Sequence, residues 1–109
     1  MTHRVVFSPE AQGDLLQLYD FIAGRAGEVR ALGYVERIAA HCTGFSDFPE
    51  RGTRRDHIRP GLRTTGFERR VIIAFTVAAE TVTILRVLYG ARDLEAAFDD
   101  EAGSGLSER

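Results

Sequence analysis

The chain contains no lysine and no tryptophan, and it has a single cysteine, Cys42. A lone cysteine excludes an internal disulfide bond, and no cluster of cysteine and histidine residues has the spacing of a zinc site. No apolar run approaches the ~18 residues of a membrane-spanning helix, and the N-terminus lacks the features of a signal peptide. These absences predict a cytoplasmic protein that has no metal, no cofactor and no membrane association.

Positive charge is carried entirely by arginine, with 14 basic residues in all. Seven of them lie in residues 51–70, where only Asp56 and Glu68 oppose them. Guanidinium groups suit paired contacts with carboxylates or phosphates. This basic segment therefore predicts a local contact with an acidic peptide or a phosphate, although a solvated loop would have the same composition.

The order of elements predicts an α+β fold. Residues 4–7 are β-rich, and Ser8-Pro9-Glu10 is typical of a helix start. Two amphipathic helical patterns follow, broken between Gly24 and Gly27 and ended by Pro49. Three strands are predicted at 62–67, 70–77 and 81–89, and a short helix at 93–98. We expect an N-terminal strand, an α-helical hairpin packed on a small antiparallel sheet, and a short C-terminal helix.

The domain organisation follows from length and composition. A chain of 109 residues has room for one hydrophobic core. Residues 1–98 are predicted to form a single domain, and residues 99–109, acidic and rich in glycine and serine, to be a disordered tail. The 70–77 strand is apolar on both faces, which predicts a central position in the sheet. The pairing position of the first strand stays open.

One arginine interrupts the last predicted strand, whose sequence is TILRVLYGARD. Strand alternation places Val82, Ile84, Arg86 and Leu88 on one face, so Arg86 would emerge from the sheet among apolar neighbours. A purely structural alternative is that Arg86 pairs with Asp93 and locks the strand to the last helix.

These segments together resemble the RelE/ParE superfamily of bacterial type II toxin–antitoxin toxins. The resemblance covers residues 4–98 and is carried by VVFSPEAQGDLLQLYDFI, FSDFPERGTR, IRPGLR and, above all, ILRVLYGARD. The last segment is typical of ParE-type toxins. Two positions depart from the pattern: the usual aromatic residue in the middle of the second strand of the antiparallel sheet is replaced in IIAFTV, and Tyr89 stands where relatives often have histidine.

The resemblance implies one of two activities. ParE-like members inhibit DNA gyrase, whereas RelE-like members are ribosome-dependent mRNA endoribonucleases. Metal-free RNA cleavage needs a general base, and the three histidines are poorly placed for that role: His3 is terminal, His41 falls on the buried side of a helix and His57 is in a loop. We therefore expect a gyrase inhibitor with no catalytic residue. The alternatives are a ribonuclease and a binding module of the same fold that has lost its target.

The resemblance also implies partners and site residues. A ParD-like antitoxin would bind the toxin directly, as a heterotetramer or a larger assembly, and DNA would be contacted only through the antitoxin. The candidates for toxicity and target binding are Arg86, Tyr89, Arg92, Asp93 and Phe98. The candidates for antitoxin binding are Tyr19, Tyr34, Phe45, Arg54, Arg55, Arg59, Arg63 and Arg86, although the aromatic residues among them would also suit a buried core.

Overall fold

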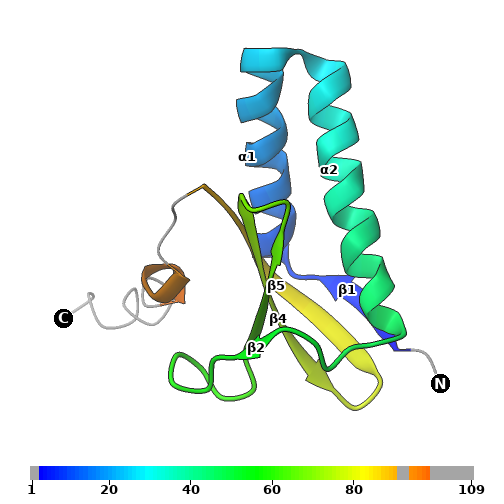
Figure 1. Cartoon of the computed structure of the whole chain (residues 1–109), viewed down its shortest axis with the longest axis vertical. Coiled ribbons are helices and arrows are strands. Elements are labelled where there is room, and N and C mark those ends of the chain that lie inside the picture. Colours follow the sequence, from blue (N-terminus) through cyan, green and yellow to red (C-terminus); the bar gives the residue numbers. More distant parts are fainter. Residues whose placement is uncertain (1–2, 91–93, 99–109) are drawn as a thin grey trace.

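The computed structural model describes residues 3–90 and 94–98. The elements in chain order are β1 (Arg4–Phe7), α1 (Pro9–Ala26), α2 (Glu28–Thr43), a 3-10 turn (Gly44–Ser46), β2 (Thr53–Arg54), β3 (Arg63–Phe67), β4 (Val71–Ala78) and β5 (Thr81–Tyr89). A short helix follows at residues 94–98. Figure 1 shows the two long helices side by side against the sheet, with their connected ends extending beyond it. The predicted α+β architecture is confirmed.

The five strands form one sheet in the order β1-β5-β4-β3-β2. β1 runs parallel to β5, with Arg4 opposite Thr81, and every other pair of neighbours is antiparallel. β1 is therefore an edge strand, which answers the question that the sequence leaves open. β4 is the middle strand, as its two apolar faces predict.

The helical hairpin is built from a capped start and a one-residue turn. The Ala11 N–H donates to Ser8 Oγ at 3.0 Å, which caps α1 as predicted. Gly27 has a φ of +95° and stands alone between the two helices. Glycine adopts such a positive φ at little cost, so a single residue reverses the chain and sets α2 antiparallel to α1.

The main core lies between the hairpin and the sheet. It is formed by apolar side chains from both helices, the 3-10 turn and the two central strands. Its buried members are Ala11, Leu18, Ile38, Cys42, Phe45, Val71, Ile73, Phe75, Val82, Ile84 and Val87. This packing leaves the opposite face of the sheet to other elements.

The opposite face carries a second, smaller cluster. Leu62, Ala74 and Phe98 are buried there, and Ile58 and Leu85 pack against them. The short C-terminal helix and the loop before β3 thus cover part of this face. Figure 1 shows this helix, in orange, on the side of the sheet away from the hairpin.

Two features of the sheet differ from prediction. In β5, Arg86 pairs with Ala74 but Ile84 pairs with Phe75, so Leu85 is an extra residue in a β-bulge. The predicted common face for Val82, Ile84, Arg86 and Leu88 is therefore wrong, because the bulge reverses the alternation after Ile84. In addition, the two-residue strand β2 lies between Pro49 and the first predicted strand of the antiparallel sheet, where no strand is predicted, because two residues are too few to show a period.

Candidate functional site

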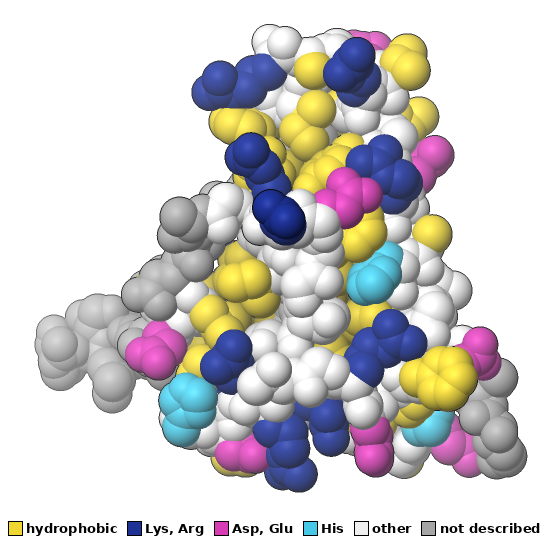
Figure 2. Space-filling model, viewed as in Figure 1, with side chains coloured by type: hydrophobic (Ala, Val, Ile, Leu, Met, Phe, Trp, Pro, Cys, Tyr) yellow, Lys and Arg dark blue, Asp and Glu magenta, His cyan; other side chains and the backbone are white. Residues whose placement is uncertain are grey.

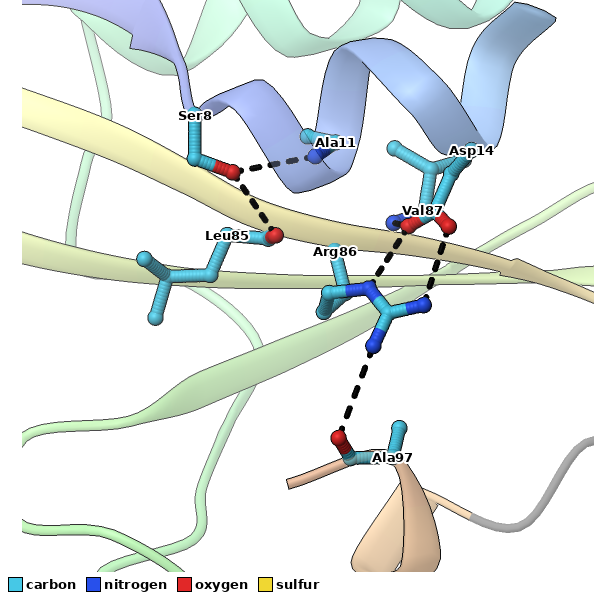
Figure 3. A network of polar contacts seen from close by, with 7 residues as sticks. All are labelled: Ser8, Ala11, Asp14, Leu85, Arg86, Val87 and Ala97. Carbon is cyan, nitrogen blue, oxygen red and sulfur yellow. Dashed lines mark hydrogen bonds and ion pairs between the residues drawn. The ribbon is translucent and has the colours of Figure 1, made fainter. Parts of the chain in front are cut away.

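The junction between α1 and the bulge of β5 is held by an ion pair. Arg86 Nε and Nη2 donate to the two carboxylate oxygens of Asp14 at 2.8 and 2.9 Å. The Val87 N–H donates to the same carboxylate at 2.8 Å, and Arg86 Nη1 reaches the Ala97 carbonyl at 3.5 Å (Figure 3). Arg86 thus connects the first helix, the last strand and the C-terminal helix.

A serine supports this junction from the start of α1. The Ser8 hydroxyl donates to the Leu85 carbonyl at 2.9 Å while it accepts from Ala11 N–H (Figure 3). A bulge leaves backbone groups outside the regular ladder, and here Ser8 and Asp14 bind Leu85 and Val87 on the two sides of Arg86. The bulge is therefore stabilised by side chains that lie more than 70 residues earlier in the chain.

The geometry changes the interpretation of Arg86. The Arg86 side chain is only 16% exposed, and that of Asp14 only 8%. A guanidinium held this way by a carboxylate is not presented as a surface cation. The alternative partner, Asp93, lies outside the described residues, as does Arg92. Sequence reasoning missed Asp14, although a carboxylate three residues after Ala11 and four before Leu18 on an apolar helix face was a signal for it.

The other two C-terminal candidates have different environments. Tyr89 is half-buried, and its ring lies 5.8 Å from Phe21 and 6.2 Å from Tyr34, centroid to centroid. Phe98 is buried in the second cluster, with the Arg59 guanidinium 5.4 Å from its ring centroid. Tyr89 therefore belongs to a partly exposed aromatic surface, whereas Phe98 anchors the C-terminal helix.

Two hollows meet at Tyr89. One, of about 450 Å³, lies between α1 and the end of β5, and Phe21 and Val87 line it. The other, of about 560 Å³, lies between the far half of the hairpin and the sheet, and it is lined by Ile22, Ala26, Val29, Arg30, Gly33, Tyr34, Arg37, Glu68, Arg70 and Tyr89. Figure 2 shows hydrophobic side chains in this region with basic side chains around them. We call the two hollows together the hairpin groove.

The rim of the hairpin groove is basic. The Arg25 guanidinium lies 4.4 Å from the centroid of the Phe21 ring. Arg37 pairs with Glu68 at 3.2 Å, and both side chains are about half exposed. Burial, and then the Glu68 charge, raise the pKa of Tyr34, which keeps its phenol neutral at the groove wall. The groove thus combines an apolar floor with a positively charged edge.

The predicted antitoxin residues fall into separate groups. Tyr34 lines the hairpin groove and Tyr19 is half-buried on α1. Phe45 is fully buried between His41 and Phe75, so we assign it to the core and not to a surface. None of the predicted antitoxin residues is among the exposed large apolar residues of the described chain, which are Leu16, Phe21, Val29, Leu32 and Phe48.

The predicted basic residues gather around the loop before β3. Arg54 pairs with Asp56 at 2.9 Å. Arg55 donates to Thr64 Oγ1 and Arg63 to the Arg51 carbonyl, at 3.1 and 3.2 Å. Arg63 pairs with Phe75 of β4, away from Glu68, Arg70 and Tyr89 of the hairpin groove. Figure 1 shows β2 and the loop before β3 at the end of the sheet away from the connected ends of the two long helices. The structure therefore divides the predicted antitoxin residues between two surfaces.

Acid–base groups are scattered in the part of the chain that the structure describes. His57 Nε2 lies 3.8 Å from Glu95, with both side chains largely exposed. Burial, and then the nearby Arg51, lower the pKa of His41. Burial raises the pKa of the Cys42 thiol to about 12, which makes it unreactive. Across residues 3–90 and 94–98, no three His, Cys, Asp or Glu side chains are grouped to hold a metal ion, and no helix is long and apolar enough to cross a membrane.

Known proteins resemble this chain over most of its length. The family model described as the ParE toxin of the type II toxin–antitoxin system parDE matches residues 5–94. Toxin ParE3 of Caulobacter vibrioides is 31% identical over 93 residues, which span 85% of this chain and 92% of that protein.

Two solved structures share the fold. A chain of the chromosomal ParDE system from P. aeruginosa matches with a TM-score of 0.72 and 26% identity, over 82% of this chain and 97% of that one. A chain of the toxin–antitoxin complex RelBE2 from Mycobacterium tuberculosis matches with a TM-score of 0.60 and 21% identity, over 84% and 95% of the two chains. The second match concerns the fold alone.

Proposed function

The chain belongs to the ParE toxin family of type II toxin–antitoxin systems, and we propose that a ParD-like antitoxin neutralises it by direct binding and that its target is DNA gyrase. The similar ParDE structure from P. aeruginosa is named as part of a toxin–antitoxin system, which supports an antitoxin as partner. The assembly is a heterotetramer or larger, and it meets DNA through the antitoxin.

The hairpin groove is the surface that best suits the antitoxin. Its apolar lining includes Ile22, Val29 and Tyr34, and its basic lining includes Arg30, Arg37 and Arg70. An amphipathic helix with apolar residues on one side and acidic residues at its margins would match both features. Val29 is 87% exposed and so provides a large apolar contact for such a helix.

A matched pair of substitutions tests this location. Val29→Glu places a negative charge in the groove and should weaken antitoxin binding at least tenfold, because an apolar contact is lost and acidic partner residues are repelled. Leu16→Glu makes the same change at a residue that is 68% exposed and does not line either hollow. Calorimetric titration of each variant with antitoxin should show the loss for Val29→Glu only. Equal losses in both variants would place the interface elsewhere.

The ion pair between Arg86 and Asp14 is the observation that favours inhibition of a protein target over RNA cleavage. A ribonuclease needs a cation placed to stabilise the charge on a phosphorane. Arg86 lies in β5 and is held by Asp14 at 2.8 Å in a mostly buried ion pair. This supports a protein that acts by docking on a large target, for which surface aromatic residues and arginines supply binding energy.

Inducible expression without antitoxin separates the possible activities. A gyrase inhibitor should produce filamentous cells and a DNA-damage response, and the purified protein should reduce DNA supercoiling by gyrase. An mRNA endoribonuclease should instead stop translation and leave cleaved messages. A binding module without a target should leave growth unchanged, and either of these two results would refute gyrase inhibition.

A further inference from the structure

We propose that the side of the helical hairpin that takes no part in the main core binds a basic amphipathic helix of a partner protein. This surface, called the outer hairpin face below, is formed by apolar residues of both long helices. They are Leu16, Tyr19 and Ala23 of α1 and Leu32, Val35 and Ala39 of α2. The proposal does not depend on whether gyrase is the target.

Helical spacing and packing set these residues apart from the rest of the hairpin. The three residues of each helix follow one another at intervals of three and four, the spacing at which side chains share one helix face. Within the described part of the chain, none of the six belongs to the main core cluster or to the partly buried residues packed against it. None of them lines either hollow of the hairpin groove. The outer hairpin face is therefore a separate surface.

Two leucines on this face are exposed to solvent. Leu16 is 68% exposed and Leu32 is 51% exposed. Tyr19 and Val35, which are half-buried, are equally far from the Gly27 turn along the two antiparallel helices and are therefore level with each other. Leu32 lies nearer to the turn than this pair and Leu16 lies farther from it. The exposed leucines thus stand at the two ends of a continuous apolar strip.

Small residues shape this strip for a helix. Ala23 is almost as far from Gly27 as Leu32 is, and Ala39 is almost as far as Leu16 is. Each exposed leucine is therefore level with an alanine on the neighbouring helix. Large side chains beside small ones form the ridges and grooves into which a further helix packs. The side chains of a partner helix can lie above the two alanines and between the two leucines.

The border of the outer hairpin face is acidic. Asp20 follows Leu16 by four residues, and Glu28 and Glu36 stand four residues before and after Leu32. Each carboxylate therefore lies one helical turn from an exposed leucine. All three residues are exposed, and none of them forms an ion pair with another described residue. Their charges are available to a partner.

The three arginines of the hairpin lie on its other side. Arg30 and Arg37 line the hairpin groove, and Arg25 lies over Phe21, which lines the second hollow of that groove. The acidic border repels nucleic acid, an anionic membrane and the same face of a second copy, whereas it attracts lysine or arginine beside the apolar residues of a helix. This chemistry is the opposite of that expected for the antitoxin in the hairpin groove.

A helical peptide of leucine and lysine only, with its leucines along one side, probes this surface. Leu16→Ser together with Leu32→Ser should weaken its binding to the full chain at least tenfold, as measured by fluorescence anisotropy, because the two largest exposed apolar contacts are lost. Both leucines are exposed, so the hairpin keeps its core. Val29→Ser is the matched control and should bind the peptide normally, because Val29 is 87% exposed but lines the hairpin groove.

A second pair of variants tests the acidic border. Asp20→Asn with Glu36→Gln should weaken the peptide about fivefold at low ionic strength and reduce the salt dependence of binding. Glu50→Gln with Glu80→Gln removes the same amount of charge from exposed residues outside the hairpin. This control pair should change the affinity less than twofold.

Three results would overturn the proposal. Equal losses in the two charge variants would mean that net charge alone holds the peptide. Unchanged affinity after Leu16→Ser with Leu32→Ser would mean that the peptide binds elsewhere. A dimer of the unmodified chain in sedimentation equilibrium, which the two serine substitutions dissociate, would assign the outer hairpin face to a second copy of the chain.

Discussion

Asp14 and Arg86 are the residues on which the junction between helix and strand depends. Their two hydrogen bonds of 2.8 and 2.9 Å are made by side chains that are 8% and 16% exposed. A buried pair contributes little net stability, because both ions lose their hydration, but removing one partner leaves the other charge poorly solvated. The carboxylate also accepts from Val87 N–H, so its loss affects the backbone of the bulge.

Asp14→Asn is expected to destabilise the fold by about 3 kcal/mol, because Arg86 then lacks its carboxylate in a poorly solvated position. The measurement is urea unfolding followed by circular dichroism. Glu68→Gln is the matched control, because its partner Arg37 is 55% exposed in the same kind of pair and such pairs contribute at most about 1 kcal/mol. Similar costs for the two substitutions would contradict the role given to Asp14.

His41 gives the fold a pH dependence. Its ring lies between Phe45 and Phe67, at centroid distances of 5.4 and 5.1 Å. Its Nε2 is buried without a hydrogen-bond partner among the described residues. Burial, and then the Arg51 charge, lower the pKa of His41 from its ordinary 6.5. The unfolded chain therefore binds a proton more readily than the folded chain as pH falls through 6.5, and stability is lost in that direction.

The free energy of unfolding should accordingly be lower at about pH 5.5 than at about pH 7.5. His41→Gln should remove most of this difference, since it removes the titrating ring. His57→Gln should retain it, because His57 is exposed beside Glu95 and not buried in the core. Urea midpoints at the two pH values provide the comparison. A native-like pH dependence in His41→Gln would assign the effect to another group.

At the scale of elements, the fold was largely predictable because its signals are local. Ser8 and Pro9 begin α1, Gly27 ends it, and β4 and β5 show apolar runs of the right length. The bulge was not predictable, because Leu85 is apolar like its neighbours and only pairing with β4 reveals the extra residue. Asp14 stands out on the apolar face of its helix, but its pairing with Arg86 was not predictable, because the partner lies 72 residues away and no spacing rule links the two.

The position of β2 depends on one glycine. Gly52 has a φ of +77°, and a Cβ there would clash with the Thr64 carbonyl oxygen in β3. Gly61 has a similar φ of +81°, but a Cβ there would meet open space. Gly61→Ala should therefore cost only the backbone strain of about 1 kcal/mol. Gly52→Ala should cost at least about 1 kcal/mol more, because β2 must move away from β3.

Urea unfolding of the two variants gives the difference directly, and hydrogen exchange of the Arg55 amide reports on the β2–β3 region. That amide donates to the Leu62 carbonyl at 2.7 Å, immediately after the strand. Faster exchange should appear in Gly52→Ala and not in Gly61→Ala. Equal stability in the two variants would mean that β2 is not held as tightly as the close approach indicates.

At the scale of the whole molecule, the two faces of the sheet are used differently. The hairpin face contains the main core and continues into the hairpin groove. The other face contains the cluster around Leu62, Ala74 and Phe98, which attaches the C-terminal helix. Arg86 touches both sides of this arrangement, through Asp14 on α1 and the Ala97 carbonyl on the C-terminal helix. Changes at Arg86 or Phe98 should therefore alter how the C-terminal helix is presented to a target.

Toxicity should depend on this helix and its anchor, and not on the histidines. Arg86→Ala and Phe98→Ala should restore colony formation after induction, because the first removes the link to Ala97 and the second empties the buried cluster. His57→Ala and His41→Gln should remain toxic. Phe98→Ala also costs about 3 kcal/mol or more of stability. Co-purification with antitoxin must therefore show that each variant folds. Phe98→Leu refills most of the space and should regain part of the toxicity. Loss of toxicity in folded His57→Ala, together with cleaved mRNA in cells that express the unmodified toxin, would identify an acid–base mechanism and a ribonuclease instead.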